Sequence, residues 1–140
     1  MKNEIWKPIT QIVLRSGVVH TFEGYEVSNF GRVRSYKQKY GQVSQSNIMS
    51  GLNRPLRTVP KIINGRPDNY GYPQFCLSDI NKVRKNFRSH VLVMQTFVGL
   101  PEEGQIICHA DDVKTNNHIS NLRYGTYADN GADMVKNSKK

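Results

Sequence analysis

Short stretches of alternating hydrophobic and polar residues run through the first third of the chain and predict β-strands. Ile12–Leu14 and Val18–Phe22 flank a turn that ends at Gly17, which is the pattern of a β-hairpin. Tyr25–Ser28 and Arg32–Tyr36 alternate in the same way. Because successive side chains of a strand point to opposite faces, we expect a half-buried, strand-rich segment here.

The middle of the chain predicts a long polar loop, a second hairpin and a helix. Residues 37–60 are rich in Gln, Ser, Asn, Gly and Arg, which favours a loop or an arm that orders on a partner. Tyr72–Leu77 and Val83–Arg88 are separated by a turn and predict two paired strands. Val91–Phe97 has helical spacing, and we expect His90, which opens this helix, to be a structural hydrogen-bonding residue.

The last third predicts a strand, a long loop, a second strand and a helix. Gln105–His109 is an apolar strand that ends in a histidine, and Ala110–Ser120 is a polar loop. Asn121–Thr126 forms the second strand, and Thr126 is suited to cap a helix that continues to the lysines at the end of the chain. Asp111 and Asp112, in the loop, are expected to be turn-forming residues.

The positive charge of the chain is concentrated in its middle. The formal net charge is +9, and residues 31–90 contain twelve Lys and Arg against two Asp, a net of +10, so the other residues together net −1. This distribution is typical of polyanion-binding proteins, and a solvated cationic surface is the alternative. Arg32 and Arg34 share one face of their predicted strand, where they suit phosphates or serve as ordinary edge charges.

The cysteines and the apolar segments exclude several classes of protein. Cys76 and Cys108 belong to no CxxC motif, which argues against a disulfide scaffold and predicts no structural zinc. A reducing, cytoplasmic setting is therefore expected. The N-terminus lacks an apolar run of signal-peptide length, and no segment approaches the roughly 20 apolar residues that span a bilayer. We therefore expect a protein that is not secreted and does not bind or span a membrane.

The chemistry-bearing residues resemble those of a known nuclease family. His109, Asn121 and Asn130 have the spacing of the H-N-N variant of the HNH, or ββα-metal, motif, and CHADDVKTNNHISNLRYGTYADNGAD resembles phage HNH homing endonucleases. SHVLVMQTFVGLPEEG resembles the helix that precedes this motif. EIWKPI with GYEVSNFGRVRS resembles the N-terminal DNA-binding module of the family, and NYGYPQFCLS resembles the strand between the two modules. Four matching segments in this order make the resemblance specific.

The resemblance implies roles for individual residues. His109 is the expected general base, since histidine exchanges protons near neutral pH. Asn121 is expected to act beside it by pinning the loop that orients it. Asn130 is the expected ligand of one divalent cation, Mg²⁺ or Mn²⁺, which polarises the phosphate. Cys108 occupies a position where the family often has an acidic ligand, so we weigh it as a ligand, with Asp133 as an alternative source of negative charge.

We therefore predict an α+β protein with a strand-rich basic module at residues 1–60 and an HNH ββα-metal module at residues 61–140, whose ββα core covers residues 105–136. The expected function is divalent-metal-dependent hydrolysis of double-stranded DNA, by nicking as a monomer or double-strand cleavage as a dimer. A non-catalytic DNA-binding regulator with a weakened HNH site is the alternative, and Cys108 favours it. A third hypothesis, an RNA-binding basic protein, accounts for the positive charge but not for the set from His109 to Asn130. The expected DNA contacts are basic residues, namely Arg32, Arg34, Lys37, Arg54, Arg57, Arg84, Lys85, Arg88 and Arg123.

Overall fold

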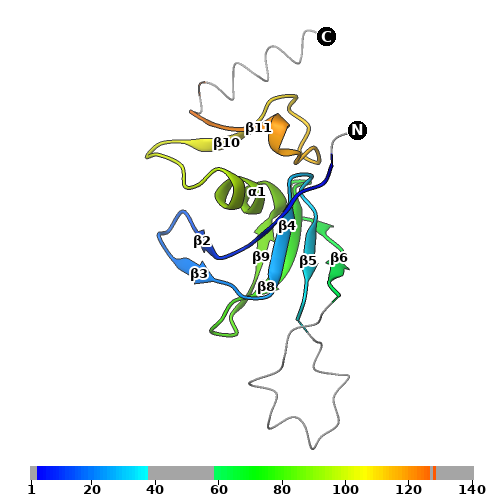
Figure 1. Cartoon of the computed structure of the whole chain (residues 1–140). Helices are drawn as coiled ribbons and strands as arrows, with labels where there is room; N and C mark the ends of the chain where they lie inside the picture. The colour runs from blue at the N-terminus through cyan, green and yellow to red at the C-terminus, as the bar shows by residue number, and fades with distance from the viewer. Residues whose placement is uncertain (1–2, 38–58, 127, 129–140) are drawn as a thin grey trace, which may run out of the picture.

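Four small antiparallel sheets surround one helix in the computed structural model of the chain, which describes residues 3–37, 59–126 and 128 (Figure 1). The helix α1 (Ser89–Phe97) contacts strands of all four sheets. In Figure 1 it lies between the hairpin that carries β10 and β11 and the strands around β4 and β8. Within the described part of the chain, no helix is long and apolar enough to cross a membrane.

The N-terminal sheet has the strand order β1-β4-β5-β6. The sequence predicts β4 (Tyr25–Ser28) and β5 (Val33–Ser35) correctly, and they pair with Val27 opposite Val33. The two outer strands, β1 (Trp6–Pro8) and β6 (Lys61–Ile63), were not predicted. β6 begins just after the expected module boundary at residue 60 and pairs with β5, with Ile63 opposite Val33.

A separate hairpin joins this sheet to the helix. β2 (Gln11–Val13) and β3 (Val19–Thr21) pair antiparallel around a turn, as the sequence predicts. The turn contains Gly17, whose φ of +90° favours glycine. Gln95 of α1 accepts a hydrogen bond from the Val13 N–H (2.9 Å) and donates one to the Val13 carbonyl (2.9 Å). This two-way contact fixes the hairpin against the helix.

The third sheet leads directly into α1. It consists of β7 (Arg66–Pro67), β8 (Pro73–Ser78) and β9 (Arg84–Arg88), with Phe75 opposite Phe87. β8 and β9 were predicted, and α1 begins immediately after β9, two residues before the apolar pattern from which it was predicted. The helix ends at Phe97, before Gly99 with its φ of +123°.

The fourth sheet is the predicted C-terminal hairpin. β10 (Ile106–His109) pairs with β11 (Leu122–Gly125), and the short 3₁₀-helix η4 (Ile119–Asn121) lies between them. The helix predicted after Thr126 falls outside the described residues. The strand–loop–strand order of the expected motif is therefore confirmed, up to the start of its helix.

One hydrophobic core connects the sheets. It contains buried residues from each part of the described chain: Ile9, Ile12, Phe22, Tyr25, Val27, Val33, Phe75, Leu77, Phe87, Leu92, Val93, Met94 and Leu122. Ile107 and Tyr124 of the C-terminal hairpin pack against it. Because this core includes both the N-terminal sheet and α1, the fold holds the N-terminal strands in a fixed relation to the hairpin that carries His109.

Candidate active site

His109 lies at the end of β10, in a buried position next to α1. Its side chain is 7% exposed, and it pairs across the hairpin with Leu122, which belongs to the core. His109 Nε2 and Asn117 Oδ1 are 2.8 Å apart. Because the amide oxygen can only accept, Nε2 carries the proton in this bond, and a neutral ring then has its lone pair on Nδ1. The arrangement holds the imidazole in the tautomer that a proton acceptor at Nδ1 needs.

The loop that follows His109 is folded around Asn121. The Asn121 amide group donates to Asp111 Oδ1 (2.9 Å) and to the Asn116 carbonyl (2.9 Å), and its oxygen accepts from the Asp111 N–H (3.2 Å). Asp111 also accepts from the Val113 N–H at 2.9 Å, as a turn-forming aspartate does. These bonds close the loop on itself beside His109, so Asn121 contacts loop groups rather than the imidazole.

Two further aromatic rings lie against His109. The His90 ring stands edge-on to it with centroids 5.1 Å apart, and the Tyr72 ring lies 5.2 Å from His90 and 6.1 Å from His109. Burial, and then the neighbouring His109, lowers the pKa of His90 to about 3, so His90 stays neutral. Its Nδ1 is buried and has no hydrogen-bond partner among the described residues, which corrects the expectation that His90 is a hydrogen-bonding linker.

A turn of the N-terminal sheet packs directly on the His109 loop. The Ile119 N–H donates to the Asn29 carbonyl at 2.9 Å, and the Ser89 hydroxyl donates to the Gly31 carbonyl at 2.7 Å. Gly31 has a φ of +89°, and a Cβ at this position would lie 2.8 Å from both Asn117 Cβ and Ser89 Oγ. Only glycine fits this close approach without a shift. The turn therefore supports Asn117, and Asn117 in turn holds His109.

Cys108 lies on the other face of the hairpin. It is 1% exposed and pairs with Arg123, one residue out of step with the His109–Leu122 pair. Because side chains alternate along a strand, Cys108 and His109 point to opposite faces of β10. The other expected metal ligands, Asn130 and Asp133, lie outside the described residues. Within the residues that are described, no group of three or more His, Cys, Asp or Glu side chains could hold a metal ion.

The two arginines of the N-terminal sheet share one face, as expected, but both are paired within the protein. The guanidinium groups of Arg32 and Arg34 lie 5.6 Å and 4.2 Å from the centre of the Trp6 ring. Arg32 forms an ion pair with Glu4, and Arg34 Nε donates to Glu26 Oε1 at 2.6 Å. A phosphate that binds here must therefore compete with two carboxylates.

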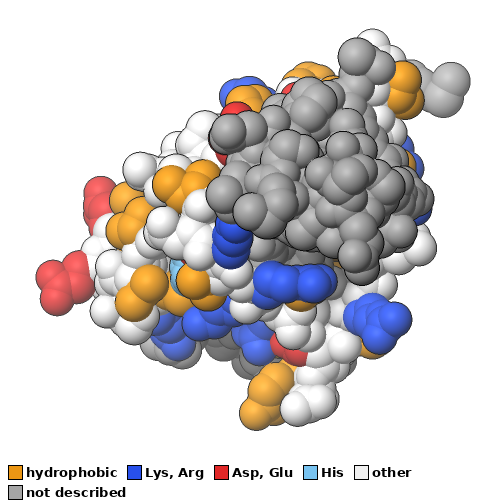
Figure 2. Space-filling model, turned by 90° about the horizontal axis from the view of Figure 1, so that it is seen from below, with side chains coloured by type: hydrophobic (Ala, Val, Ile, Leu, Met, Phe, Trp, Pro, Cys, Tyr) orange, Lys and Arg blue, Asp and Glu red, His pale blue; other side chains and the backbone are white. Residues whose placement is uncertain are grey.

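The remaining expected DNA contacts differ in how accessible they are. Lys37 is partly buried: its amine donates to the Ser78 carbonyl at 3.2 Å, and burial lowers its pKa. Arg84 and Lys85 are exposed on β9, and Arg88 and Arg123 are half-exposed. Arg54 and Arg57 lie outside the described residues. Figure 2 shows several Lys and Arg side chains spread over the face of the molecule that is seen from below, with fewer acidic ones.

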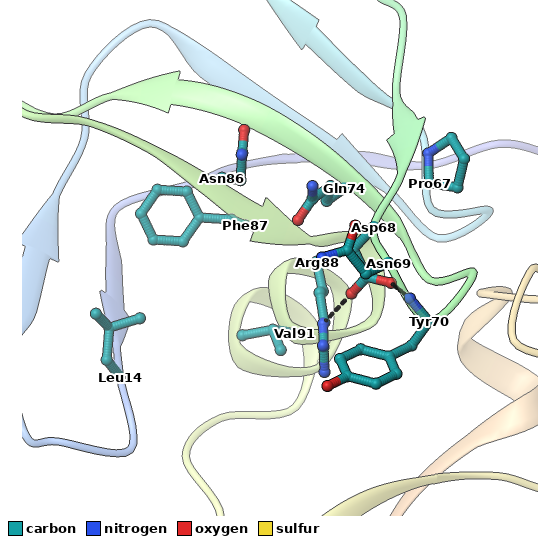
Figure 3. A pocket seen from close by; sticks show the side chains of 10 residues that line it. All are labelled: Leu14, Pro67, Asp68, Asn69, Tyr70, Gln74, Asn86, Phe87, Arg88 and Val91. Carbon is teal, nitrogen blue, oxygen red and sulfur yellow. Dashed lines mark hydrogen bonds and ion pairs between the residues drawn. The ribbon is translucent and has the colours of Figure 1, made fainter.

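An open depression of about 500 Å³ lies beside this site. Its walls include Asp68, Tyr70, Gln74 and Arg88, and Figure 3 shows the Arg88 side chain reaching toward Asp68 between the β7–β8 turn and α1. Arg88 Nε donates to Asp68 Oδ2 at 2.7 Å. His109 does not line the depression, which therefore adjoins the candidate active site without being part of it.

Sequence reasoning found His109 and Asn121 but missed two neighbours of His109. Asn117 belongs to an Asn–Asn pair inside the loop, and Tyr72 precedes a strand in a different sheet. His90 was noticed but assigned a structural role. A signal for Asn117 was available, because an Asn eight residues after the histidine lies in the same loop. Tyr72 is brought to His109 only by the tertiary fold.

Known proteins match the chain over nearly its whole length. Residues 87–132 match the family model described as HNH endonuclease, and residues 4–78 match the NUMOD4 motif. Two uncharacterized HNH endonucleases of Acanthamoeba polyphaga mimivirus are similar: one is 27% identical over 120 residues and 85% of this chain, the other 30% identical over 139 residues and 98% of this chain. The chain spans only 29% and 27% of the length of these relatives.

A solved structure shares the fold. It shows DNA binding and cleavage by the HNH homing endonuclease I-HmuI, and it matches with a TM-score of 0.62 and 26% identity. The match covers 97% of this chain and 60% of that one. The α+β architecture and the family resemblance predicted from the sequence motifs are confirmed by these matches.

Proposed function

Because the chain belongs to the HNH endonucleases and carries a NUMOD4 motif, we propose that it hydrolyses phosphodiester bonds in double-stranded DNA. The observation that carries this proposal is the buried hydrogen bond between His109 Nε2 and Asn117 Oδ1. A general base needs a lone pair at a defined nitrogen, and this hydrogen bond leaves the lone pair of the neutral ring on Nδ1. The products are 5′-phosphate and 3′-hydroxyl ends.

In this mechanism His109 accepts a proton from the attacking water at Nδ1. The proton that His109 already carries at Nε2 remains shared with Asn117, which stabilises the doubly protonated ring that forms. Asn121 keeps the loop closed through its bonds to Asp111 and Asn116, so it is a positioning residue. His90 and Tyr72 pack against the imidazole and limit the orientations that its ring can take.

A divalent cation, Mg²⁺ or Mn²⁺, is part of the proposal. When bound, such an ion polarises the scissile phosphate and stabilises the leaving oxygen. The described residues do not form a site for it by themselves. We assign it to Asn130 and Asp133, together with phosphate oxygens of the DNA, and we regard the soft Cys108 thiol as a spectator because it points away from His109.

Exposed cations provide the expected binding surface for the DNA backbone. Arg84 and Lys85 project from β9, the strand that leads into α1, and no carboxylate is paired with either among the described residues. Arg32 and Arg34 join them by exchanging Glu4 and Glu26 for phosphates. With one site per chain, a monomer nicks one strand, and a double-strand break requires a dimer or two binding events.

A non-catalytic DNA-binding protein is the second candidate function. The observation that favours it is Cys108, a thiol at the position where the resemblance leads one to expect an acidic metal ligand. The two candidates differ in what a supercoiled plasmid becomes. Incubated with the protein and magnesium or manganese, the plasmid is nicked if the chain is an endonuclease, and a chelator stops the reaction. Binding of the plasmid without any nicking in either metal supports the regulator instead.

A further inference from the structure

Two cations are held beside His109 by a single aromatic ring. The Arg88 guanidinium lies 4.7 Å from the centre of the Tyr72 ring, and the Lys114 amine lies 4.9 Å from it. The same ring lies 6.1 Å from the His109 ring. Arg88 comes from the end of β9 just before α1, Lys114 from the loop after His109, and Tyr72 from the turn before β8. Three segments far apart in the sequence therefore place two positive charges one ring away from the general base.

The turn before β8 fixes both cations. Asp68 Oδ1 accepts from the Tyr70 and Tyr72 N–H groups at 2.8 and 3.0 Å, while its Oδ2 accepts from Arg88 Nε at 2.7 Å. The Lys114 amine donates to the Tyr70 carbonyl at 2.8 Å. The anchors hold each head group near the ring, but they occupy only part of its hydrogen-bonding capacity. Within the described part of the chain, the two Nη groups of Arg88 and two of the three Lys114 donors have no hydrogen-bond partner.

The charge of Lys114 is not cancelled where it stands. Its partners are a neutral carbonyl and a neutral ring, and the exposed side chain has no ion pair with a carboxylate among the described residues. Cation–π contacts at exposed sites are worth only about 0.5–1 kcal/mol, whereas a charged group with free donors binds a phosphate oxygen strongly. A lysine held this way is preorganised for an anion that arrives beside His109.

We propose that Lys114 and Arg88, supported by Tyr72, form a clamp for the DNA phosphate at the bond that His109 attacks. This inference rests on the proposed endonuclease function and adds a substrate contact next to His109. Lys114 and Arg88 touch the phosphate, and Tyr72 and Asp68 are positioning residues. The clamp neutralises the phosphate where negative charge accumulates during hydrolysis, so its loss slows cleavage in addition to weakening binding.

Lys114→Gln tests the clamp because it removes one surface charge with little change in size. Lys82→Gln is the matched control: Lys82 is also exposed, but it lies in the turn at the far end of the β8–β9 hairpin. Affinity for a random-sequence duplex is measured as a function of salt in the presence of a chelator, and single-turnover nicking is measured with saturating protein. Thermal melts establish that both variants are folded.

For Lys114→Gln we expect the salt slope of binding to fall by about 0.9, one phosphate contact, and nicking to slow by roughly tenfold or more. Lys114→Arg restores both quantities, Tyr72→Phe retains them, and Tyr72→Leu behaves like Lys114→Gln. Lys82→Gln leaves the nicking rate unchanged.

Other outcomes of these measurements distinguish failure of the phosphate clamp from failure of the proposed endonuclease function. An unchanged slope for Lys114→Gln, or a lower slope with normal nicking, overturns the clamp, and so does an equal slowing by Lys82→Gln. If the unaltered protein binds DNA but never nicks it, the proposed function fails. In that case a lower slope confined to Lys114→Gln and Tyr72→Leu still supports phosphate binding at this place.

Discussion

Replacing Gly31 with alanine perturbs the contact through which the N-terminal sheet supports the candidate active site. An alanine there must adopt a φ of +89°, and its Cβ falls 2.8 Å from Asn117 Cβ and from Ser89 Oγ. Left-handed backbone costs an L-residue about 1–2 kcal/mol. Carbon atoms prefer separations of about 3.5–4.0 Å, so both neighbours must move. We therefore expect a second penalty of about 1–3 kcal/mol from overpacking.

Gly17→Ala separates these two costs. Gly17 has nearly the same φ, +90°, but a Cβ there meets no atom within 4 Å. The control therefore includes the backbone cost alone, and Gly31→Ala should be less stable than it by about 1–3 kcal/mol, or roughly 3–12 °C in melting temperature. Differential scanning calorimetry or thermal unfolding followed by circular dichroism measures this difference directly.

The structure also predicts which function is lost. The clash pushes on Asn117, whose amide oxygen holds His109 Nε2, so Gly31→Ala should slow nicking several-fold at temperatures where the protein remains folded. DNA affinity should change little, because Gly31 itself makes no charged contact. If the two alanine variants have equal melting temperatures and equal nicking rates, the close packing of Gly31 on Asn117 does not support the active site.

Three other predictions concern charge, pH and the metal. His90 is neutral in the fold, with its pKa lowered to about 3. Its contribution to the free energy of unfolding is therefore fully present above the unfolded pKa of about 6.5 and is lost as the pH falls toward 3. Urea unfolding should show a loss of up to about 1.4 kcal/mol per pH unit below 6.5, and His90→Gln should remove this dependence; an unchanged pH profile in the variant contradicts the assignment. Glu26→Gln should tighten DNA binding by freeing Arg34, whereas Arg34→Gln should weaken it similarly on all sequences; sequence-selective loss means that Arg34 contacts bases. In magnesium titrations of nicking, Asp133→Ala should cost more than tenfold and Cys108→Ser should have little effect; the reverse result makes the thiolate a ligand and zinc the better ion.

Local patterns predicted most of the regular structure, and tertiary pairing explains what they missed. The alternation in Tyr25–Ser28 and the apolar run before His109 both gave strands that the structure contains. β1 and β6 are three-residue outer strands, and β1 contains Lys7 and Pro8. Such strands form because a neighbouring strand offers hydrogen bonds, and their own composition carries little signal.

The sequence predicted the candidate-site residues that lie in one continuous motif, but not those that tertiary contacts bring to it. The spacing of His109 and Asn121 identified the loop, because both residues belong to one continuous motif. Tyr72 and Gly31 reach this loop from other sheets, and nothing in their local sequence indicates it. In the same way, the pairing of Arg32 with Glu4 joins residues 28 positions apart, so the pattern that put Arg32 on an accessible face could not show its partner.

The assignment of His109 as general base is tested most directly by comparing His109→Ala with the unaltered protein in one plasmid experiment. Nicking of supercoiled DNA is measured under single-turnover conditions with magnesium, and affinity for the same DNA is measured with the metal chelated. The variant should lose nicking by a factor of at least about 10² while its affinity stays within a few-fold, since His109 serves the water and makes no phosphate contact. Nicking by purified His109→Ala at the rate of the unaltered protein contradicts the central claim.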